Sequence, residues 1–367
     1  MSRQYFLILL LFILPVKGIA QYTISGQVLN GNDKSPVAHA SVFLNNSVVG
    51  TTTADNGTFT LSEVRPGQYD LVVSCVGYET LHQAVIVNSS IKLPDLILAP
   101  KTLMLDEVRI KPKQDWAKNY ETFKRLFFGT TEFARQCKIT TKGLPDMLDL
   151  DFDKTTDVFT ARSDDFMEIE NKALGYYIRY YLNSLTYDYK TRLFYVEGTA
   201  AFSEMTGSKS QTHRWKKNRE KAYEGSSMHF LRAVVSNSLA EEGFRALRLI
   251  RKTDTAHKTL NGHFFNTLIE KPLDIADFTR LTDVQGEFAL SFSDCLYVEY
   301  NKKNAHKASA DWSEAAITTL IFNEPYSFFD SNGIIINPAS VSFNGNWGQR
   351  LMADLLPVDY VPDEKDR

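Results

Sequence analysis

Residues 22–98 repeat one pattern, in which apolar and polar side chains alternate between turn residues, and this pattern constrains the fold most strongly. Alternation is typical of strands that bury one face. Between two such segments, Asp55, Asn56 and Gly57 are a strong hairpin signal, because Asn and Gly tolerate the positive φ of tight turns. The expected strand segments are 24–28, 42–44, 47–53, 59–61, 69–75, 85–87 and 96–98. About seven short strands with a turn roughly every ten residues predict an antiparallel β-sandwich.

The N-terminal residues indicate export. Arg3 gives a positive start, residues 6–14 are all apolar, and small residues occupy positions 18 and 20. As a helix, this run spans only about half of a ~30 Å bilayer core, so it is too short to be an anchor. We therefore predict a signal peptide at residues 1–20, cleaved between Ala20 and Gln21. No later segment is long and apolar enough to cross a membrane, so the mature chain is expected to have no transmembrane helix.

Length and charge bound the domain count and the partners. A chain of 367 residues suggests two domains, and a formal net charge of −3 gives no attraction for nucleic acid. We expect the sandwich at 21–100, a linker at 101–114 that Pro112 keeps irregular, and an α+β domain at 115–367. The predicted fold class is mainly β, with few contacts crossing the linker.

The sandwich segment also resembles a known family at specific positions. The matching residues include Ile24, Gly26, Val28, Pro36, Val37, Ala40, Gly50, Gly57, Phe59, Gly67, Tyr69, Gly77 and Tyr78. They resemble the carboxypeptidase regulatory-like domain, a transthyretin-like or immunoglobulin-like seven-stranded sandwich found in exported proteins of certain Gram-negative bacteria. Ala54 departs from the family pattern, which usually has an acid there. The resemblance implies a docking or structural module without catalytic residues, in a protein of the periplasm, the outer membrane or the cell surface.

The remainder of the chain predicts one long helix, then strands and a second helical stretch. Asp115 is expected to cap the first helix and Gly129 to end it. Its apolar face is formed by Trp116, Tyr120, Phe123 and Phe127. The strands are expected at 148–152, 174–185, 193–196, 287–300, 316–322 and 333–336, and the second helical stretch at about 210–240. This part resembles an uncharacterised region of the same exported proteins, on segments 116–123, 170–176, 219–226 and 353–357, and the resemblance brings no activity with it.

No catalytic or metal-binding motif is present in the sequence. Zinc peptidases of the carboxypeptidase type hold their metal with a His and a Glu three residues later, and no histidine here has that Glu. The histidines are His39, His82, His213, His229, His257, His263 and His306. There is also no HExxH, no GxSxG elbow and no phosphate-binding glycine loop. We therefore expect no catalytic residues, cofactor or metal site. His257 and His263 are six residues apart, and they are the two histidines that could come together in space.

The cysteine count is odd. An exported protein with Cys75, Cys137 and Cys295 has at least one thiol that is free or paired between chains. Cys75 is interpreted as a small buried apolar residue. A pairing of Cys137 with Cys295 stays open, because the sequence does not fix their separation.

Several other groupings could carry chemistry, and each has a simpler interpretation. Asp149, Asp151 and Asp153 have calcium-loop spacing, but the Gly and Glu of such a loop are missing, so a strand with a solvated acidic face is favoured. The basic run 213–221 could bind phosphate or an acidic glycan, although such runs are more often the solvated face of a helix. Six tyrosines could stack on sugars or pack across strands: Tyr176, Tyr177, Tyr180, Tyr181, Tyr187 and Tyr189.

Two further side chains are expected to be buried. His229 lies between Met228 and Phe230 and is interpreted as a hydrogen-bonded core histidine. Arg219 is expected to form a buried ion pair, with Glu170 or Asp354 as candidate partners.

These observations favour a non-enzymatic cell-envelope protein, in which a sandwich for docking is joined to a domain that mediates an interaction with another envelope protein or a glycan. The alternative is a glycan- or peptide-binding protein of the periplasm or cell surface that uses the tyrosine-rich sheet. A third hypothesis, an unrecognised hydrolase, would show as a pocket that gathers acids or histidines with perturbed pKa values.

Overall fold

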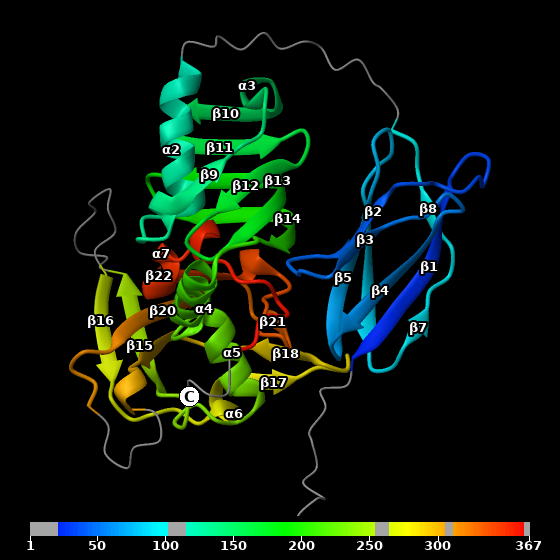
Figure 1. Ribbon diagram of the computed structural model, residues 1–367. Coiled ribbons are helices and arrows are strands. Elements are labelled where there is room, and N and C mark those ends of the chain that lie inside the picture. The colour runs from blue at the N-terminus through cyan, green and yellow to red at the C-terminus, as the bar shows by residue number, and fades with distance from the viewer. Residues whose placement is uncertain (1–20, 102–114, 254–263, 305–310, 363–367) are drawn as a thin grey trace, which may run out of the picture.

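The computed structural model describes residues 21–101, 115–253, 264–304 and 311–362. A β-sandwich lies beside a larger part, built of further sheets with helices packed against them (Figure 1). The fold is mainly β, as predicted. The predicted signal peptide and nearly all of the predicted linker lie outside the described residues. Within the described ranges, no helix has the length and apolar character needed to span a bilayer.

The predicted sandwich is present, with eight strands. β1 pairs with β4, β7 and β8 in one sheet, and the other sheet has the order β3-β2-β5-β6. The alternation of the sequence becomes alternating burial, so that Ile24 and Val28 of β1 and Phe59 and Leu61 of β4 face the core. The strands are β1 (Tyr22–Asn30), β2 (Ser41–Leu44), β3 (Gly50–Thr52), β4 (Thr58–Val64), β5 (Gly67–Ser74), β6 (Leu81–Val87), β7 (Ile91–Lys92) and β8 (Leu96–Leu98).

A six-stranded antiparallel sheet opens the second part, and the long strand β13 is its centre. β14 pairs along one side of β13, while β11 and β12 also pair with it. Helix α2 covers one face with Phe123 and Phe127, and its start corrects a prediction. Asp115 makes no capping hydrogen bond, because its backbone is already in the helical region, whereas a capping residue needs an extended conformation. The elements are α2 (Trp116–Phe128), η2 (Ala134–Gln136), β9 (Cys137–Ile139), α3 (Leu144–Met147), β10 (Leu148–Asp153), β11 (Val158–Ser163), β12 (Met167–Asn171), β13 (Tyr176–Asp188) and β14 (Phe194–Glu204).

The predicted helical stretch is two helices, α4 (Lys209–Tyr223) and α5 (Ser227–Val235). Ser208 caps α4 through a reciprocal pair of hydrogen bonds with Gln211. The break between the helices lies at Gly225, whose φ of 64° is readily adopted only by glycine. A Cβ there would also lie 2.3 Å from the ring of Tyr300, so the break is fixed by packing as well.

Two further sheets complete the fold, and α5 packs into their core. The five-stranded sheet has the order β16-β15-β19-β20-β22, and the three-stranded sheet the order β17-β18-β21. The strand predicted at 287–300 is two strands in different sheets, because residues 291–294 leave the extended conformation. The predicted strand at 333–336 is only an isolated bridge between Phe329 and Ile335. The elements are β15 (Phe244–Thr253), β16 (Phe264–Ile269), α6 (Ile275–Phe278), β17 (Thr279–Leu281), β18 (Glu287–Leu290), β19 (Cys295–Tyr300), η3 (Lys302–Asn304), β20 (Ala316–Phe322), β21 (Ser327–Asp330), η4 (Pro338–Ser340), β22 (Val341–Gly345), α7 (Asn346–Gln349) and η5 (Met352–Asp354).

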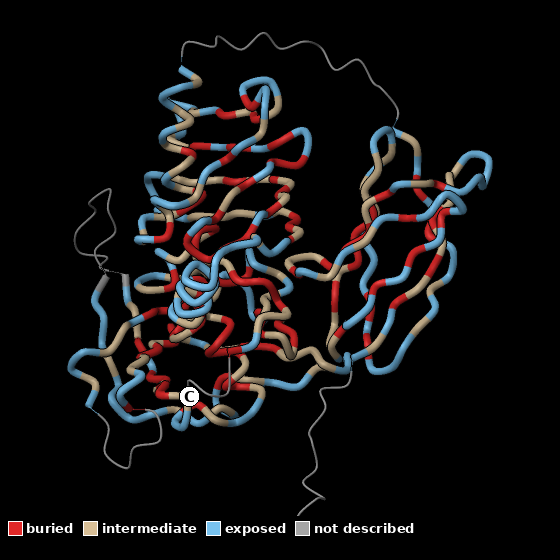
Figure 2. Tube along the Cα trace, in the orientation of Figure 1, coloured by how far each residue is buried: buried red, intermediate tan, exposed pale blue. Residues whose placement is uncertain are grey.

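The sandwich makes an extensive contact with the second part, which we call the seam. The turn after β2 adds to the edge of β14: Asn46 donates its backbone N–H to the carbonyl of Ala200 at 2.7 Å, and Phe202 donates to Ser47 at 2.9 Å. Ser47 and Ala201 form a parallel bridge there. Buried residues continue across the contact (Figure 2). The expectation of few contacts between the two parts was therefore wrong.

The chain after η5 forms the other half of the seam. Arg232 of α5 donates to three carbonyls, those of Asn332, Val358 and Tyr360, each at 2.8 Å. This clamp directs Val358 toward the sandwich, where its side chain is part of the hydrophobic core. On the sheet side, Arg179 donates to the hydroxyl of Ser41 at 3.0 Å.

Candidate functional site

Arg219 organises the centre of the second part. Its Nε donates to the carbonyl of Leu174 at 2.7 Å, its Nη2 to the carbonyl of Gly175 at 3.2 Å, and its Nη1 to Oε1 of Glu204 at 2.7 Å. The guanidinium lies 3.9 Å from the ring centre of Tyr176. The predicted buried cation is therefore present, but its partner is Glu204 and neither Glu170 nor Asp354.

The segments that carried the second resemblance meet around this arginine. Asn171 donates its side-chain amide to the carbonyl of Ala353 at 3.0 Å, and Trp347 donates its indole N–H to the carbonyl of Gly225 at 2.7 Å. Gly175 is required because a Cβ there would lie 2.3 Å from the indole of Trp215. The residues that carried the second resemblance therefore have a structural role, because their contacts hold the centre of the second part together.

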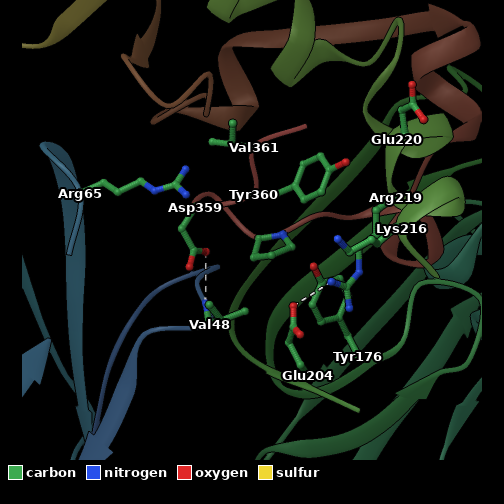
Figure 3. A pocket seen from close by; sticks show the side chains of 11 residues that line it. Val48, Arg65, Tyr176, Glu204, Lys216, Arg219, Glu220, Asp359, Tyr360 and Val361 are labelled. Carbon is green, nitrogen blue, oxygen red and sulfur yellow. Dashed lines mark hydrogen bonds and ion pairs between the residues drawn. The ribbon is translucent and has the colours of Figure 1, made fainter. Parts of the chain in front are cut away.

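A cavity of about 220 Å³ opens beside Arg219, and we call it the junction cleft (Figure 3). One wall comes from the sandwich, a second from α4, the floor from β13 and β14, and the roof from the chain after η5. Its lining residues are Val48, Arg65, Tyr176, Glu204, Lys216, Arg219, Glu220, Pro357, Asp359, Tyr360 and Val361. The cleft exists only because the two parts are joined at the seam.

Asp359 stands at the sandwich side of the junction cleft. Its carboxylate accepts a hydrogen bond from the backbone N–H of Val48 at 3.2 Å. Burial raises the pKa of Asp359, while that hydrogen bond and the nearby charge of Arg65 act in the opposite direction. Figure 3 shows the guanidinium of Arg65 on the same side as this carboxylate.

A second and larger cavity lies between β14 and the five-stranded sheet, and we call it the inter-sheet groove. It encloses about 1020 Å³ and is lined mainly by apolar atoms. All of its large buried lining side chains are apolar or aromatic: Phe127, Tyr180, Met228, Val341, Trp347, Met352 and Leu356. The size is at the upper end of the range for small-molecule sites, which are mostly apolar with a few placed polar groups.

The polar groups of the inter-sheet groove are mainly cationic. Arg192, Arg251 and Arg350 line it, with Asp354 as the one carboxylate in its lining. Arg350 donates to the carbonyls of Ala222 and Glu224 at 3.0 and 2.9 Å, and its pKa is lowered by burial. Arg251 donates to the side chain of Asn266 at 3.3 Å. Within the described ranges, the exposed guanidinium of Arg192 makes no hydrogen bond, so it is available to a ligand.

Some of the six tyrosines and some residues of the basic run 213–221 pack inside the protein, whereas others are exposed to solvent. Tyr176 and Tyr180 are buried, Tyr181 packs on Phe166, and Tyr187 packs on Tyr189. Tyr177 is 49% exposed and stands apart from these pairs. The sheet therefore offers no continuous tyrosine platform. In the basic run, Trp215 and Arg219 face the sheet, whereas His213, Arg214, Lys216 and Lys217 are exposed.

The remaining candidates have structural roles. Asp149, Asp151 and Asp153 lie on β10 as predicted, with Asp149 paired to Arg162. His229 is buried, accepts from the N–H of Gly225 at 3.1 Å and lies 3.1 Å from Glu242. The three cysteines Cys75, Cys137 and Cys295 are free, so Cys137 and Cys295 do not pair.

No group of three or more potential metal ligands occurs among the described residues. His257, His263 and His306 lie outside them. Burial raises the pKa of three carboxyls, those of Asp330, Asp354 and Asp359, but they do not share a site. Asp354 lines the inter-sheet groove, Asp359 lines the junction cleft, and Asp330 lines neither. Each is held by neighbouring donors, as in the 2.6 Å hydrogen bond from Thr131 to Asp354.

The protein therefore consists of a transthyretin-like sandwich that is joined to a larger α+β part. One cavity lies between the two parts and the other lies within the second part. Comparison with known families bears out the first resemblance: the family model of the CarboxypepD_reg-like domain matches residues 24–110. No curated protein matches the chain.

Comparison with solved structures gives matches of low overall similarity. A type II cohesin–X–dockerin complex of Acetivibrio cellulolyticus matches 21% of this chain and 56% of that one, at 21% identity and a TM-score of 0.20. A DUF3823 family protein of Bacteroides ovatus matches over 51% of this chain and 83% of its own, at 14% identity and a TM-score of 0.19. A DUF3823 family protein of Bacteroides uniformis covers 84% and 99%, at 6% identity and a TM-score of 0.17. TM-scores and sequence identities this low carry no conclusion about function.

Proposed function

We propose that this protein is a non-enzymatic binding protein of the cell envelope, in which the sandwich is a fixed docking module and the inter-sheet groove takes a ligand. The observation that carries the proposal is the groove itself, a cavity of about 1020 Å³ whose buried lining is apolar. Export rests on the N-terminal apolar run and the small residues before Gln21.

The lining indicates the class of ligand. The buried part offers Phe127, Trp347 and Met352 to an apolar body, which gains from leaving water. The exposed part carries Arg192, and Arg251 lies in the same lining, so the cations exceed the single carboxylate of Asp354. A ligand with an apolar body and an anionic head therefore matches both ends of the groove.

The experiment uses purified mature protein and a fluorescent fatty acid as the probe, with its uncharged alcohol as the comparison. We expect saturable binding of the acid, weaker binding of the alcohol, and a change in Trp347 fluorescence, because that indole lines the groove. Arg192→Gln should weaken binding of the fatty acid severalfold. Lys190→Gln, on the same loop but outside the groove lining, should leave that binding unchanged.

A blocking variant separates the groove from general surface adsorption. Ile321→Trp adds bulk inside the groove, and Ile317→Trp adds the same bulk on the same face of β20 outside it. Binding should be lost in the first and kept in the second. Equal binding in both, or no saturable binding in the parent protein, would remove the groove as the ligand site.

Envelope location has its own test. Mass spectrometry of the protein from the envelope fraction should show a mature chain that starts at Gln21. Full-length protein recovered from the cytoplasm would contradict export.

A further inference from the structure

We infer that the junction cleft binds a saccharide unit, a function separate from the proposed ligand of the inter-sheet groove. The inference starts from an unpartnered polar group. Tyr176 is 2% exposed, and within the described part of the chain its hydroxyl makes no hydrogen bond. Figure 3 shows this side chain at the floor of the cleft, with its oxygen directed into the open space.

The ring of Tyr176 is buried, but its hydroxyl is not among the buried polar atoms without a partner, so the oxygen is accessible from the cleft. A hydroxyl can both donate and accept, so it can bind a polar group that enters the cleft. The position of Tyr176 is fixed on both sides. The guanidinium of Arg219 lies 3.9 Å from the ring centre, and the ring of Phe202 meets its edge at a centroid distance of 5.5 Å. These two contacts hold the ring in place, and the hydroxyl is the part of Tyr176 that we assign to a ligand.

The charges of the junction cleft are balanced. Three cations, Arg65, Lys216 and Arg219, share the lining with three carboxylates, Glu204, Glu220 and Asp359. Glu204 is paired with Arg219, and Glu220 with Lys302 at 3.3 Å. A lining with no excess of either sign selects neither anions nor cations, which favours a neutral polar ligand.

Hydroxyl groups fit such a lining because each can donate one hydrogen bond and accept others. Arginine only donates and a carboxylate only accepts, so neighbouring hydroxyls on a sugar ring can satisfy both at once. Arg65 and Asp359 stand together on the sandwich side of the cleft, with the Tyr176 hydroxyl on the floor. These three groups form the recognition set that we assign.

The size of the cleft limits the ligand. About 220 Å³ is below the usual range for drug-sized sites, and the cavity is partly open to solvent. A single sugar ring, as a free monosaccharide or as the end of a longer glycan, matches this space. The sandwich supplies Arg65 and the second part supplies Tyr176, so both parts must be present for binding.

The experiment is a titration of the mature protein with glucose, galactose, mannose and N-acetylglucosamine, observed by saturation-transfer NMR and calorimetry. Glucuronate and glucosamine test the charge argument. The disaccharides of each neutral sugar distinguish a free sugar from a chain end. We expect at least one neutral sugar to bind at millimolar concentration, ahead of both charged sugars.

Tyr176→Phe removes only the unpartnered hydroxyl and should weaken binding about three- to tenfold at unchanged thermal stability. Tyr177→Phe is the matched control, since its neighbouring ring is 49% exposed and outside the cleft. Val48→Trp fills the cleft from the sandwich side and should abolish binding. Ile321→Trp, which blocks the other cavity, should leave sugar binding intact, so the two proposals fail separately.

Three outcomes overturn the inference: no neutral sugar binds, a charged sugar binds best, or Tyr176→Phe and Val48→Trp bind like the parent protein.

Discussion

Val358 donates its backbone N–H to the carbonyl of Asn46 at 2.6 Å and buries its side chain in the core of the sandwich. A residue near the C-terminal end of the described chain thus completes the N-terminal domain. The same segment carries Asp359, which accepts from the N–H of Val48. The two parts of the protein are joined by shared core as well as by surface contact.

Val358→Ala tests this shared core. The side chain is 5% exposed, and its loss removes apolar burial and leaves a cavity. We expect a loss of about 2 kcal/mol in the free energy of unfolding, measured by urea denaturation. Val361→Ala is the control, because Val361 is 44% exposed and should change stability by less than about 0.5 kcal/mol. Equal effects of the two substitutions would contradict the shared core.

The sandwich is also expected to fold alone. Among its buried core residues, Val358 is the one contributed from outside residues 21–100, and Ile334 of the second part packs against the core as a partly buried residue. The other residues of this core belong to the sandwich itself. A fragment of residues 21–100 should give a β-type circular-dichroism spectrum and a cooperative melt, at lower temperature than the sandwich within the full chain. A disordered spectrum would show that the seam is needed for folding.

Arg219→Lys is predicted to destabilise the second part although it keeps the charge. Lysine has no planar fork, so it cannot reach the carbonyls of Leu174 and Gly175 and also pair with Glu204. Buried carbonyls without donors cost about 1–3 kcal/mol each, and we expect a loss of about 2–3 kcal/mol in total. Arg214→Lys, on the exposed face of the same helix, should be nearly neutral. The melting temperatures of the two variants are compared by thermal denaturation. Equal melting temperatures would contradict a stabilising role for the hydrogen bonds of Arg219.

Asp330 gives stability a defined pH dependence. Burial raises the pKa of its carboxyl to about 6 from 3.8, so the folded protein keeps a proton that the unfolded chain has lost. Stability from this group is therefore complete below about pH 4 and is lost as the pH rises to about 6, by up to about 3 kcal/mol. Asp354 and Asp359 shift in the same direction and add to the slope.

Asp330→Asn should reduce that slope without abolishing it. Its side-chain oxygen can still accept from the N–H of Ile334, a contact of 2.9 Å in the parent protein. Urea denaturation of parent and variant at pH 4, 5, 6, 7 and 8 gives the comparison. If the difference in the free energy of unfolding between parent and variant stayed constant from pH 4 to pH 8, Asp330 would not be the titrating group.

The sandwich was predictable from sequence because its signals are local. The alternating apolar residues of 24–28 and 59–61 point into the same core. The turn at Asn56 and Gly57 is predicted by residues that are adjacent in the sequence. The strand predicted at 287–300 was wrong for the opposite reason. Both halves are extended, but residues 291–294 redirect the chain between two sheets, and tertiary packing decides that change.

The candidate sites were predictable only in fragments. Arg219 and Tyr176 belonged to segments that the second resemblance marked, and the burial of Arg219 was expected. Its partner Glu204 was missed, because the pairing depends on the register of β13 and β14. Arg65 and Asp359 carried no signal, since the cleft that they line is formed when distant segments dock at the seam. The inter-sheet groove draws on many elements and has no sequence pattern of its own.

The pairing of Ser47 with Ala201 has a consequence for how this protein stays dispersed. β14 has β13 on one side only, and the turn after β2 occupies part of its other side with backbone hydrogen bonds. An uncovered strand edge is a template on which another chain can add. A chain that began at residue 115 would expose Ala200, Ala201 and Phe202 at that edge. We therefore expect it to form aggregates whose growth a soluble copy of residues 21–100 suppresses.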